Sequence, residues 1–162
     1  MPYFNMKQAI IAVGTNIGDC QQNIQQAVQA INLLPMNTQV LKEAAIYETE
    51  PFDVPDQQQN YFNTCLLIET DFSPEALLGA CLGIEVGLGR VRKVWHGERI
   101  IDLDLIFYEG EVRETKELVL PHPGYQERLF VLEPMMDLCP SGIFSEWNFL
   151  SEYQELKALE NR

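Results

Sequence analysis

The chain has 162 residues, a length typical of one domain, and 46% of them are hydrophobic while 22% are charged. This composition excludes a disordered chain and predicts one globular domain over residues 1–162. Eleven Lys and Arg against 24 Asp and Glu give a net charge of −13. That charge argues against nucleic acid or an anionic membrane as a partner, because both bind basic surfaces.

The sequence also bears on the expected location of the protein. No apolar run approaches the roughly 20 residues of a membrane span, and the N-terminal residues contain no signal-peptide core. The cysteines form no C-x-x-C pair, so reduced thiols are expected in place of a zinc site or a disulfide framework: Cys20, Cys65, Cys81 and Cys139. We therefore expect a cytoplasmic protein.

The first half of the chain alternates strand and helix signals. An apolar run predicts a strand over residues 7–13, which ends at a turn cluster beginning with Gly14. Asp19 can cap the following helix, whose apolar residues recur at helical spacing as far as Leu34. Two further strands are then predicted, over residues 38–47 and 61–68.

A second helix and a strand follow. The sequence Ser-Pro-Glu at residues 73–75 is typical of a helix start, and Gly87 and Gly89 mark the predicted end of this helix. Residues 101–108 form the clearest strand signal of the chain.

The C-terminal part adds smaller elements. A short hairpin is predicted after Gly110, and helices are predicted near residues 127–138 and 149–159. The resulting order, β-α-β-β-α-β with C-terminal additions, is typical of a ferredoxin-like α+β sandwich, in which helices cover one face of a mostly antiparallel sheet. This architecture hosts many functions, so the function must be argued from the site.

Two acids, Asp102 and Asp104, alternate with apolar residues in the strand at 101–108. The apolar residues are expected to share one face: Ile101, Leu103, Leu105 and Phe107. The two carboxylates point the other way, with Cα atoms roughly 6.5–7 Å apart. Such a pair suits Mg²⁺, which prefers one or two carboxylates together with phosphate oxygens and water. On its own, a D-x-D motif is also typical of a solvent-facing strand surface.

A cluster of cations lies just upstream of these acids. Four of the eleven basic residues fall within ten positions: Arg90, Arg92, Lys93 and Arg99. Carboxylates that hold a metal, next to guanidinium groups that bind phosphate oxygens, match the needs of a metal–polyphosphate substrate. Glycines at positions 89 and 97 suggest a loop that closes over a nucleotide. The alternative is a solvated basic loop that balances the acidic charge of the chain.

Further residues suit a flat heterocycle. Asn63 lies in an otherwise apolar strand, and its amide offers a donor and an acceptor side by side. Phe52, Tyr61 and Phe130 are candidate walls for a ring, although aromatic residues are more often part of a core.

One more pair could contact phosphate. His122 lies between two prolines, and Arg128 follows six residues later. As an isolated pair, these two residues fit a structural role equally well.

Taken in order, these segments resemble one family closely, the 6-hydroxymethyl-7,8-dihydropterin pyrophosphokinases of folate biosynthesis. The matching segments are IAVGTNIGD (11–19), YETEPF (47–52), YFN (61–63), GRVRK (89–93), GERIIDLDL (97–105), LPHP (120–123) and ERLFVLEP (127–134). The resemblance implies a ferredoxin-like fold. It also implies transfer of pyrophosphate from ATP to the hydroxymethyl group of the dihydropterin, with release of AMP.

The resemblance also implies roles for individual residues. Asp102 and Asp104 would bind two magnesium ions. The implied triphosphate and ATP contacts are Glu85, Arg90, Arg92, Lys93, Arg99, His122 and Arg128, of which Arg90 and Arg92 are also expected to act in catalysis. The implied pterin pocket comprises Thr49, Phe52, Tyr61, Asn63 and Phe130. The expected partners are therefore ATP and the pterin, bound by a monomer or a weak dimer.

The chain departs from the family pattern before the paired aspartates. It reads Trp95-His96-Gly97-Glu98-Arg99, where the family usually has Arg-Trp-Gly-Pro-Arg. Either Trp95 or His96 could cover the pterin. Two other readings stay open: another magnesium-dependent nucleotide transferase with a D-x-D pair, and a non-catalytic ferredoxin-like module.

Overall fold

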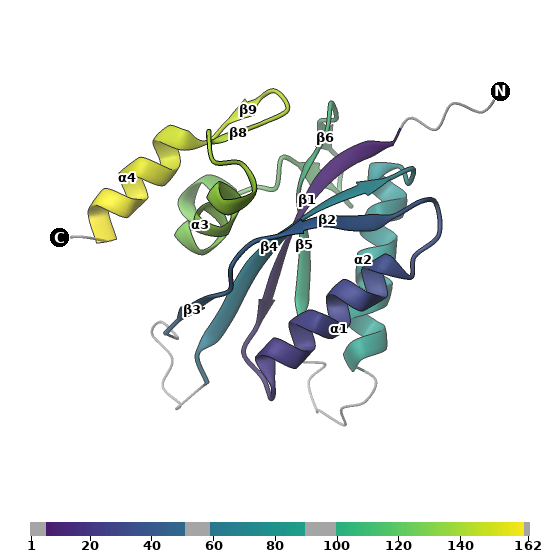
Figure 1. Ribbon diagram of the computed structural model, residues 1–162. Coiled ribbons are helices and arrows are strands. Elements are labelled where there is room, and N and C mark those ends of the chain that lie inside the picture. Colours follow the sequence, from purple (N-terminus) through teal and green to yellow (C-terminus); the bar gives the residue numbers. More distant parts are fainter. Residues whose placement is uncertain (1–5, 51–58, 90–99, 161–162) are drawn as a thin grey trace.

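The computed structural model describes residues 6–50, 59–89 and 100–160 (Figure 1). The elements are β1 (Lys7–Thr15), α1 (Cys20–Asn32), β2 (Gln39–Glu43), β3 (Tyr47–Thr49), β4 (Tyr61–Thr70), α2 (Pro74–Gly89), β5 (Asp102–Tyr108), β6 (Arg113–Glu114), β7 (Val119–Leu120), the 3₁₀ turn η1 (Tyr125–Glu127), α3 (Leu129–Leu138), β8 (Ile143–Phe144), β9 (Trp147–Asn148) and α4 (Leu150–Glu160). None of the helices in these three ranges is both long and apolar enough to cross a membrane.

An antiparallel sheet with the order β2-β4-β1-β5 forms the centre of an α+β fold, and β3 also pairs with β4. The strand predicted over residues 38–47 is divided into β2 and β3. The division follows from the backbone bonds: the Ala44 N–H still donates to Cys65 of β4, at 3.0 Å, whereas the Ala45 N–H donates to the Asp137 carboxylate of α3, also at 3.0 Å. The chain therefore bends toward α3 before it rejoins β4.

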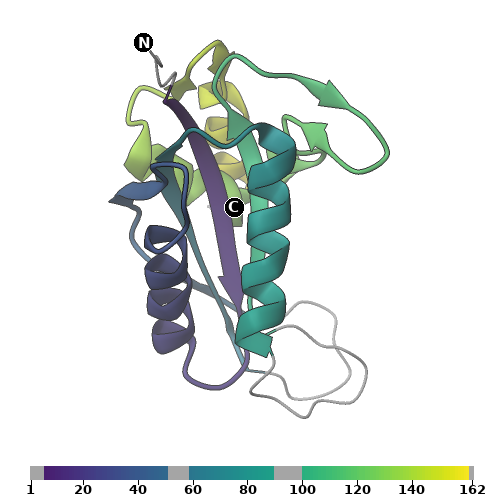
Figure 2. The ribbon, with the colours of Figure 1, turned by 90° about the vertical axis from the view of Figure 1, so that its right-hand side faces the viewer.

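The two faces of the sheet carry different helices. Helices α1 and α2 lie side by side on one face, as expected for this order of elements, while α3 and α4 lie on the opposite side (Figures 1 and 2). Buried residues such as Ile11, Leu66 and Leu105 pack toward α1 and α2. On the other face, Cys65 and Ile106 pack with residues of α3. The C-terminal addition thus covers a sheet face that the first two helices leave open.

A bulge in β5 changes the expected orientation of one residue. Ile10 of β1 is opposite Phe107, but Ile11 is opposite Leu105, so β5 holds one extra residue at this point. Ile106 and Phe107 consequently belong to the same buried cluster, on the α3 side. The prediction that Phe107 shares a face with Leu103 and Leu105 was wrong. Alternation of apolar and polar residues in the sequence does not show where a strand will contain a bulge.

Both predicted helix starts are confirmed. The Asp19 carboxylate accepts a hydrogen bond from the Gln22 N–H at 3.1 Å, and Ser73 Oγ accepts one from the Ala76 N–H at 3.1 Å. Helix α2 continues to Gly89, so Gly87 lies within the helix and does not end it.

Candidate active site

The register of three strands brings the central polar residues together. Gly14 of β1 lies opposite Asn63 of β4 on one side and opposite Asp102 of β5 on the other, and Ala12 lies opposite Asp104. Residues directly opposite one another in a sheet point to the same face. Asn63, Asp102 and Asp104 therefore share the face on which α3 packs.

A cavity of about 690 Å³ opens on this part of the sheet. Seven of the residues predicted from the sequence line it: Thr49, Tyr61, Asn63, Asp102, Asp104, Arg128 and Phe130. Other predicted residues lie outside the described residues: Phe52, Arg90, Arg92, Lys93, Trp95, His96 and Arg99. The structure thus unites residues from β3, β4, β5 and the start of α3 that are up to about 80 positions apart.

Asn63 is held at the floor of the cavity. Its side chain is buried, and its Nδ2 donates a hydrogen bond to Thr49 Oγ1 at 3.3 Å. A Cβ atom at position 14 would lie 3.2 Å from Asn63 Oδ1, closer than side chains normally approach. Gly14 therefore leaves room for the amide. The local sequence predicts a turn at this glycine, but it lies within β1, and a glycine within a strand often marks such a close approach.

Two aromatic rings flank the cavity from different elements. Tyr61 of β4 is 39% exposed and Phe130 of α3 is 42% exposed. The Arg128 guanidinium carbon lies 5.9 Å from the centroid of the Phe130 ring, within the range of a cation–π contact. Exposed rings that line a cavity can stack on a planar ligand, whereas core rings cannot.

A second, smaller cavity of about 240 Å³ adjoins the first, because Asp104 lines both. Glu85 and His122 line this second cavity, together with Lys116 and apolar residues of α2 and β5. The Nδ1 atom of His122 is buried and has no hydrogen-bond partner among the described residues. A buried ring nitrogen without a partner is available to a ligand.

Glu85 connects α2 to the strand that carries the two aspartates. It is only 3% exposed, and its carboxylate accepts a hydrogen bond from the Leu103 N–H at 2.7 Å. Because β5 is the last strand of the sheet, this side chain takes the place that a neighbouring strand would occupy. The contact of Glu85 with ATP stays a prediction; one of its observed contacts is with the backbone between Asp102 and Asp104.

The charge of the larger cavity is strongly negative among the described residues. One cation, Arg128, lines it together with six acids: Glu50, Asp102, Asp104, Glu127, Glu133 and Glu160. In the described part of the chain, no group of three or more His, Cys, Asp or Glu side chains could hold a metal ion. The Asp102–Asp104 pair nevertheless fits Mg²⁺, which completes its shell with phosphate oxygens and water.

The buried thiol of Cys81 lies near the carboxylates of Glu85 and Asp104. Burial, followed by the nearby carboxylates of Glu85 and Asp104, raises the pKa of Cys81 to about 12. A thiol with this pKa stays protonated at neutral pH and is a poor nucleophile. Cys81 belongs to the buried core that α1 and α2 form with the sheet.

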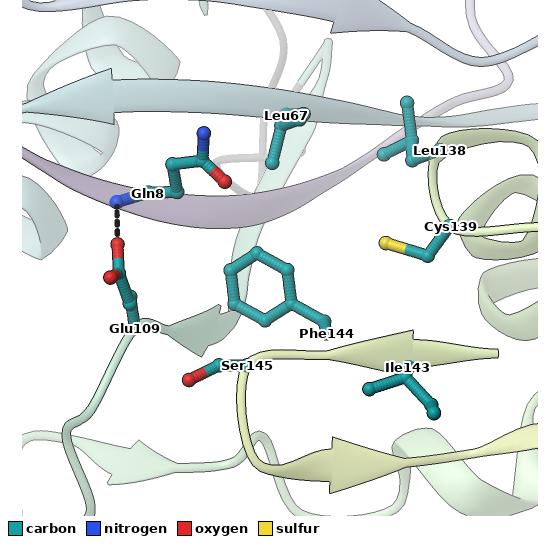
Figure 3. Close-up of a pocket in the computed structure, with 8 residues that line it drawn as sticks. All are labelled: Gln8, Leu67, Glu109, Leu138, Cys139, Ile143, Phe144 and Ser145. Atoms are coloured by element: carbon teal, nitrogen blue, oxygen red, sulfur yellow. Dashed lines mark hydrogen bonds between the residues drawn. The ribbon is translucent and has the colours of Figure 1, made fainter. Parts of the chain in front are cut away.

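A third cavity, of about 330 Å³, lies away from these residues (Figure 3). It is lined by Gln8, Leu67, Glu109, Leu138, Cys139, Ile143, Phe144 and Ser145, none of which was predicted as a site residue. The Gln8 N–H donates to Glu109 Oε1 at 2.9 Å, so this carboxylate is already engaged with the backbone of β1.

Comparison with known proteins gives the family. Residues 10–140 match the model of the 7,8-dihydro-6-hydroxymethylpterin-pyrophosphokinase (HPPK) family. The chain belongs to the HPPK family. It is 42% identical, over 81% of its length, to a 2-amino-4-hydroxy-6-hydroxymethyldihydropteridine pyrophosphokinase of Bacillus subtilis, and covers 77% of that protein. A pyrophosphokinase of the same name from Methylorubrum extorquens is 38% identical, with 83% of this chain and 84% of the relative covered.

This chain spans less than half the length of some of the proteins that it matches. The folic acid synthesis protein fol1 of Schizosaccharomyces pombe is 42% identical over 83% of this chain, which spans only 18% of that protein. Among solved structures, Plasmodium falciparum HPPK-DHPS superposes with a TM-score of 0.68 at 12% identity, over 99% of this chain and 43% of the other. This likeness supports the α+β fold.

Proposed function

We propose that this chain transfers the pyrophosphoryl group of ATP to the hydroxymethyl group of 6-hydroxymethyl-7,8-dihydropterin, a step of folate biosynthesis. One observation carries the proposal beyond family membership: four of the five candidate pterin residues (Thr49, Tyr61, Asn63 and Phe130) and the paired aspartates line one cavity, and Asp104 also lines the adjoining cavity. A group can be transferred between two bound substrates only if their binding sites meet. The order of strands and helices supports the finer, ferredoxin-like description of the fold.

The pterin would occupy the larger cavity. The Asn63 amide can pair with the donor and acceptor edge of the heterocycle, and the Tyr61 and Phe130 rings can stack on its faces. Thr49 already bonds the Asn63 amide and so fixes its orientation. Phe52 is proposed for the same pocket on the basis of the resemblance alone.

ATP would occupy the smaller cavity and reach across Asp104. Its apolar walls suit a base, and His122 Nδ1, which has no hydrogen-bond partner among the described residues, could bond a phosphate or ribose oxygen. Arg128 contributes a cation from the larger cavity. The remaining proposed phosphate contacts lie outside the described residues: Arg90, Arg92, Lys93 and Arg99.

Asp102 and Asp104 would hold the two magnesium ions. Bound there, magnesium would neutralise phosphate charge and lower the pKa of the attacking hydroxyl. The protein itself positions the two substrates and balances charge, as is general for phosphoryl-type transfer. The pterin hydroxyl oxygen would bond to the β-phosphorus and give its proton to solvent. The bond between that phosphorus and the oxygen that bridges to the α-phosphate would break, and AMP would leave with this oxygen.

The experiment is an incubation of the protein with ATP, Mg²⁺ and the hydroxymethyl-dihydropterin, with the nucleotides separated by chromatography. We expect AMP to accumulate in step with pterin consumption. ADP as the product would contradict pyrophosphoryl transfer, and AMP formation without pterin would point to another acceptor. A cytoplasmic location and a monomeric or weakly dimeric state remain predictions.

A further inference from the structure

Asp137, on α3, contacts the short strand β3 across the face of the sheet. One of its carboxylate oxygens, Oδ2, accepts two hydrogen bonds, from the Ala45 N–H at 3.0 Å and from the Tyr47 hydroxyl at 2.8 Å. A carboxylate acceptor makes such bonds stronger than those between neutral groups. A single side chain of α3 thus binds both the bend before β3 and the first residue of β3.

Both elements contribute walls to the larger cavity. Tyr47 and Thr49 of β3 line it, and so do Phe130 and Val131 of α3. Tyr47 lies directly opposite Asn63 in the register, so its ring stands beside the amide proposed to bind the pterin. Strand β3 has three residues and, within the part of the chain that the structure describes, pairs with β4 alone.

We propose that Asp137 is a positioning residue that sets the width of the pterin cavity by holding Tyr47 and Ala45 to α3. The proposal rests on the proposed function and deepens it. Asp137 is exposed and does not line the cavity; it acts through the wall to which it is bonded. When the bond is lost, β3 can move away from Phe130, and a flat ligand then fits less tightly between the walls.

The protonation state of Tyr47 keeps this contact in place. Burial of the phenol, together with its bond to Asp137, raises the pKa of Tyr47 to about 12. The hydroxyl is therefore a donor throughout the physiological pH range.

The test compares Asp137→Ala, Asp137→Asn and Tyr47→Phe with the wild-type chain in three measurements: KM for each substrate, pterin binding by calorimetry, and amide hydrogen exchange. We expect Asp137→Ala to raise KM and Kd for the pterin at least about fivefold, with KM for ATP changed less than about twofold. Tyr47→Phe should give a smaller rise, because the bond from Ala45 remains. Asp137→Asn should restore most of the affinity, because its amide oxygen can still accept both bonds.

Hydrogen exchange gives a readout that does not depend on catalysis. The amides of residues 45–49 should exchange faster in Asp137→Ala than in the wild-type protein, without any ligand. Glu155→Ala, which removes one exposed acid from α4, is the matched control and should change neither exchange at 45–49 nor pterin affinity.

Several outcomes would overturn the inference. These are unchanged exchange in Asp137→Ala, equal loss of affinity for ATP and pterin, or an Asp137→Asn variant as impaired as Asp137→Ala. A wild-type chain that binds no pterin would overturn the proposed function as well, whereas unchanged exchange with normal pterin turnover would overturn the positioning role alone.

Discussion

At the scale of single residues, Gly14 leaves the room that the Asn63 amide occupies. A methyl group at position 14 must move the amide oxygen, which it would meet at 3.2 Å. We expect Gly14→Ala to weaken pterin binding at least about fivefold and to leave ATP binding unchanged, as measured by calorimetry.

The chain offers a matched control for this substitution. Gly79 lies in α2, and a Cβ there would meet no atom within 4 Å. Gly79→Ala should keep normal pterin binding and stabilise the protein by up to about 1 kcal/mol, because alanine is the better helix former. Equal pterin affinity in the two variants would contradict the role assigned to Gly14.

Asn63 itself provides the second prediction at this scale. Replacement by alanine leaves the donor and acceptor edge of a bound pterin without partners, at a cost of about 1–3 kcal/mol in pterin binding free energy. ATP binding should change much less. Parallel losses for both ligands in calorimetry would indicate disturbed folding, since Asn63 is buried and bonded to Thr49.

How far could these residues be predicted from the sequence? Asn63, Tyr61 and Phe130 were singled out by residue type and by a family resemblance, and the fold brings them to one cavity. Gly14, Tyr47 and Asp137 were missed as site residues. Their importance depends on strand register and on a contact between segments 90 positions apart, neither of which a local pattern contains.

At the scale of secondary-structure elements, alternate side chains of β5 face the core and the larger cavity. Leu103 is 3% exposed and packs with the α1 and α2 cluster, whereas Asp102 and Asp104 face the cavity. We expect Asp102→Ala and Asp104→Ala each to lower turnover at least about a hundredfold, as is typical when one preorganised electrostatic group is removed.

Leu103→Ala is the contrasting variant. It should reduce the free energy of unfolding by roughly 2–5 kcal/mol, measured by urea titration, because a buried leucine leaves a cavity. Near-normal turnover in either aspartate variant would refute the proposed metal role.

The bond between α2 and β5 gives a further prediction at this scale. Glu85→Ala leaves the Leu103 N–H without its acceptor, and we expect a loss of about 1–3 kcal/mol in unfolding free energy. If Glu85 acts on the strand, turnover should fall without a selective rise in KM for ATP. A selective rise would instead support the direct ATP contact expected from the resemblance.

The helices and strands were predicted well where the periodicity of apolar residues is strong. They were predicted less well where a backbone N–H bonds to a group outside the sheet. Helices α1 and α2 and strands β4 and β5 lie close to their predicted ranges. The division between β2 and β3 depends on Asp137 drawing the Ala45 amide away from β4, and the bulge in β5 depends on one extra residue opposite β1. Both are tertiary effects, invisible to alternation of apolar and polar residues.

At the scale of the whole molecule, buried thiols and phenols predict sensitivity to alkali. Burial raises the pKa of Cys81 from 9.0 to about 12, and the pKa of the Cys65 thiol is also raised. Groups with a raised folded-state pKa contribute stability that is complete below the unfolded pKa and is lost as pH rises toward the folded value. We therefore expect the free energy of unfolding to decrease between pH 9 and pH 12.

Urea titrations under reducing conditions at several pH values would measure this decrease. Cys81→Ala should make it shallower, because the variant has no thiol to ionise at this position when it unfolds. Cys139→Ala, at a half-buried site, should change the slope less. An identical pH dependence in Cys81→Ala and the wild-type protein would contradict the assignment.

The net charge of the chain indicated which partners are disfavoured, but it did not show where the acidic side chains gather. The acidic composition argued against nucleic acid as a partner. It did not reveal that six acids gather around one cavity, because they come from segments spread between residues 50 and 160. The fold creates that concentration of negative charge, which favours the binding of cations in the cavity.

The alternation along β5 has a consequence for how such a protein can change over generations. Adjacent positions of one strand answer to different selective demands: side chains beside α2 must fill the core, and those facing the cavity must serve the reaction. The two sets are still coupled, because Leu103 and Leu105 of the core also line the smaller cavity beside Asp104. A substitution that stabilises the core beside α2 can therefore alter the proposed ATP cavity, so a gain in thermal stability can lower activity.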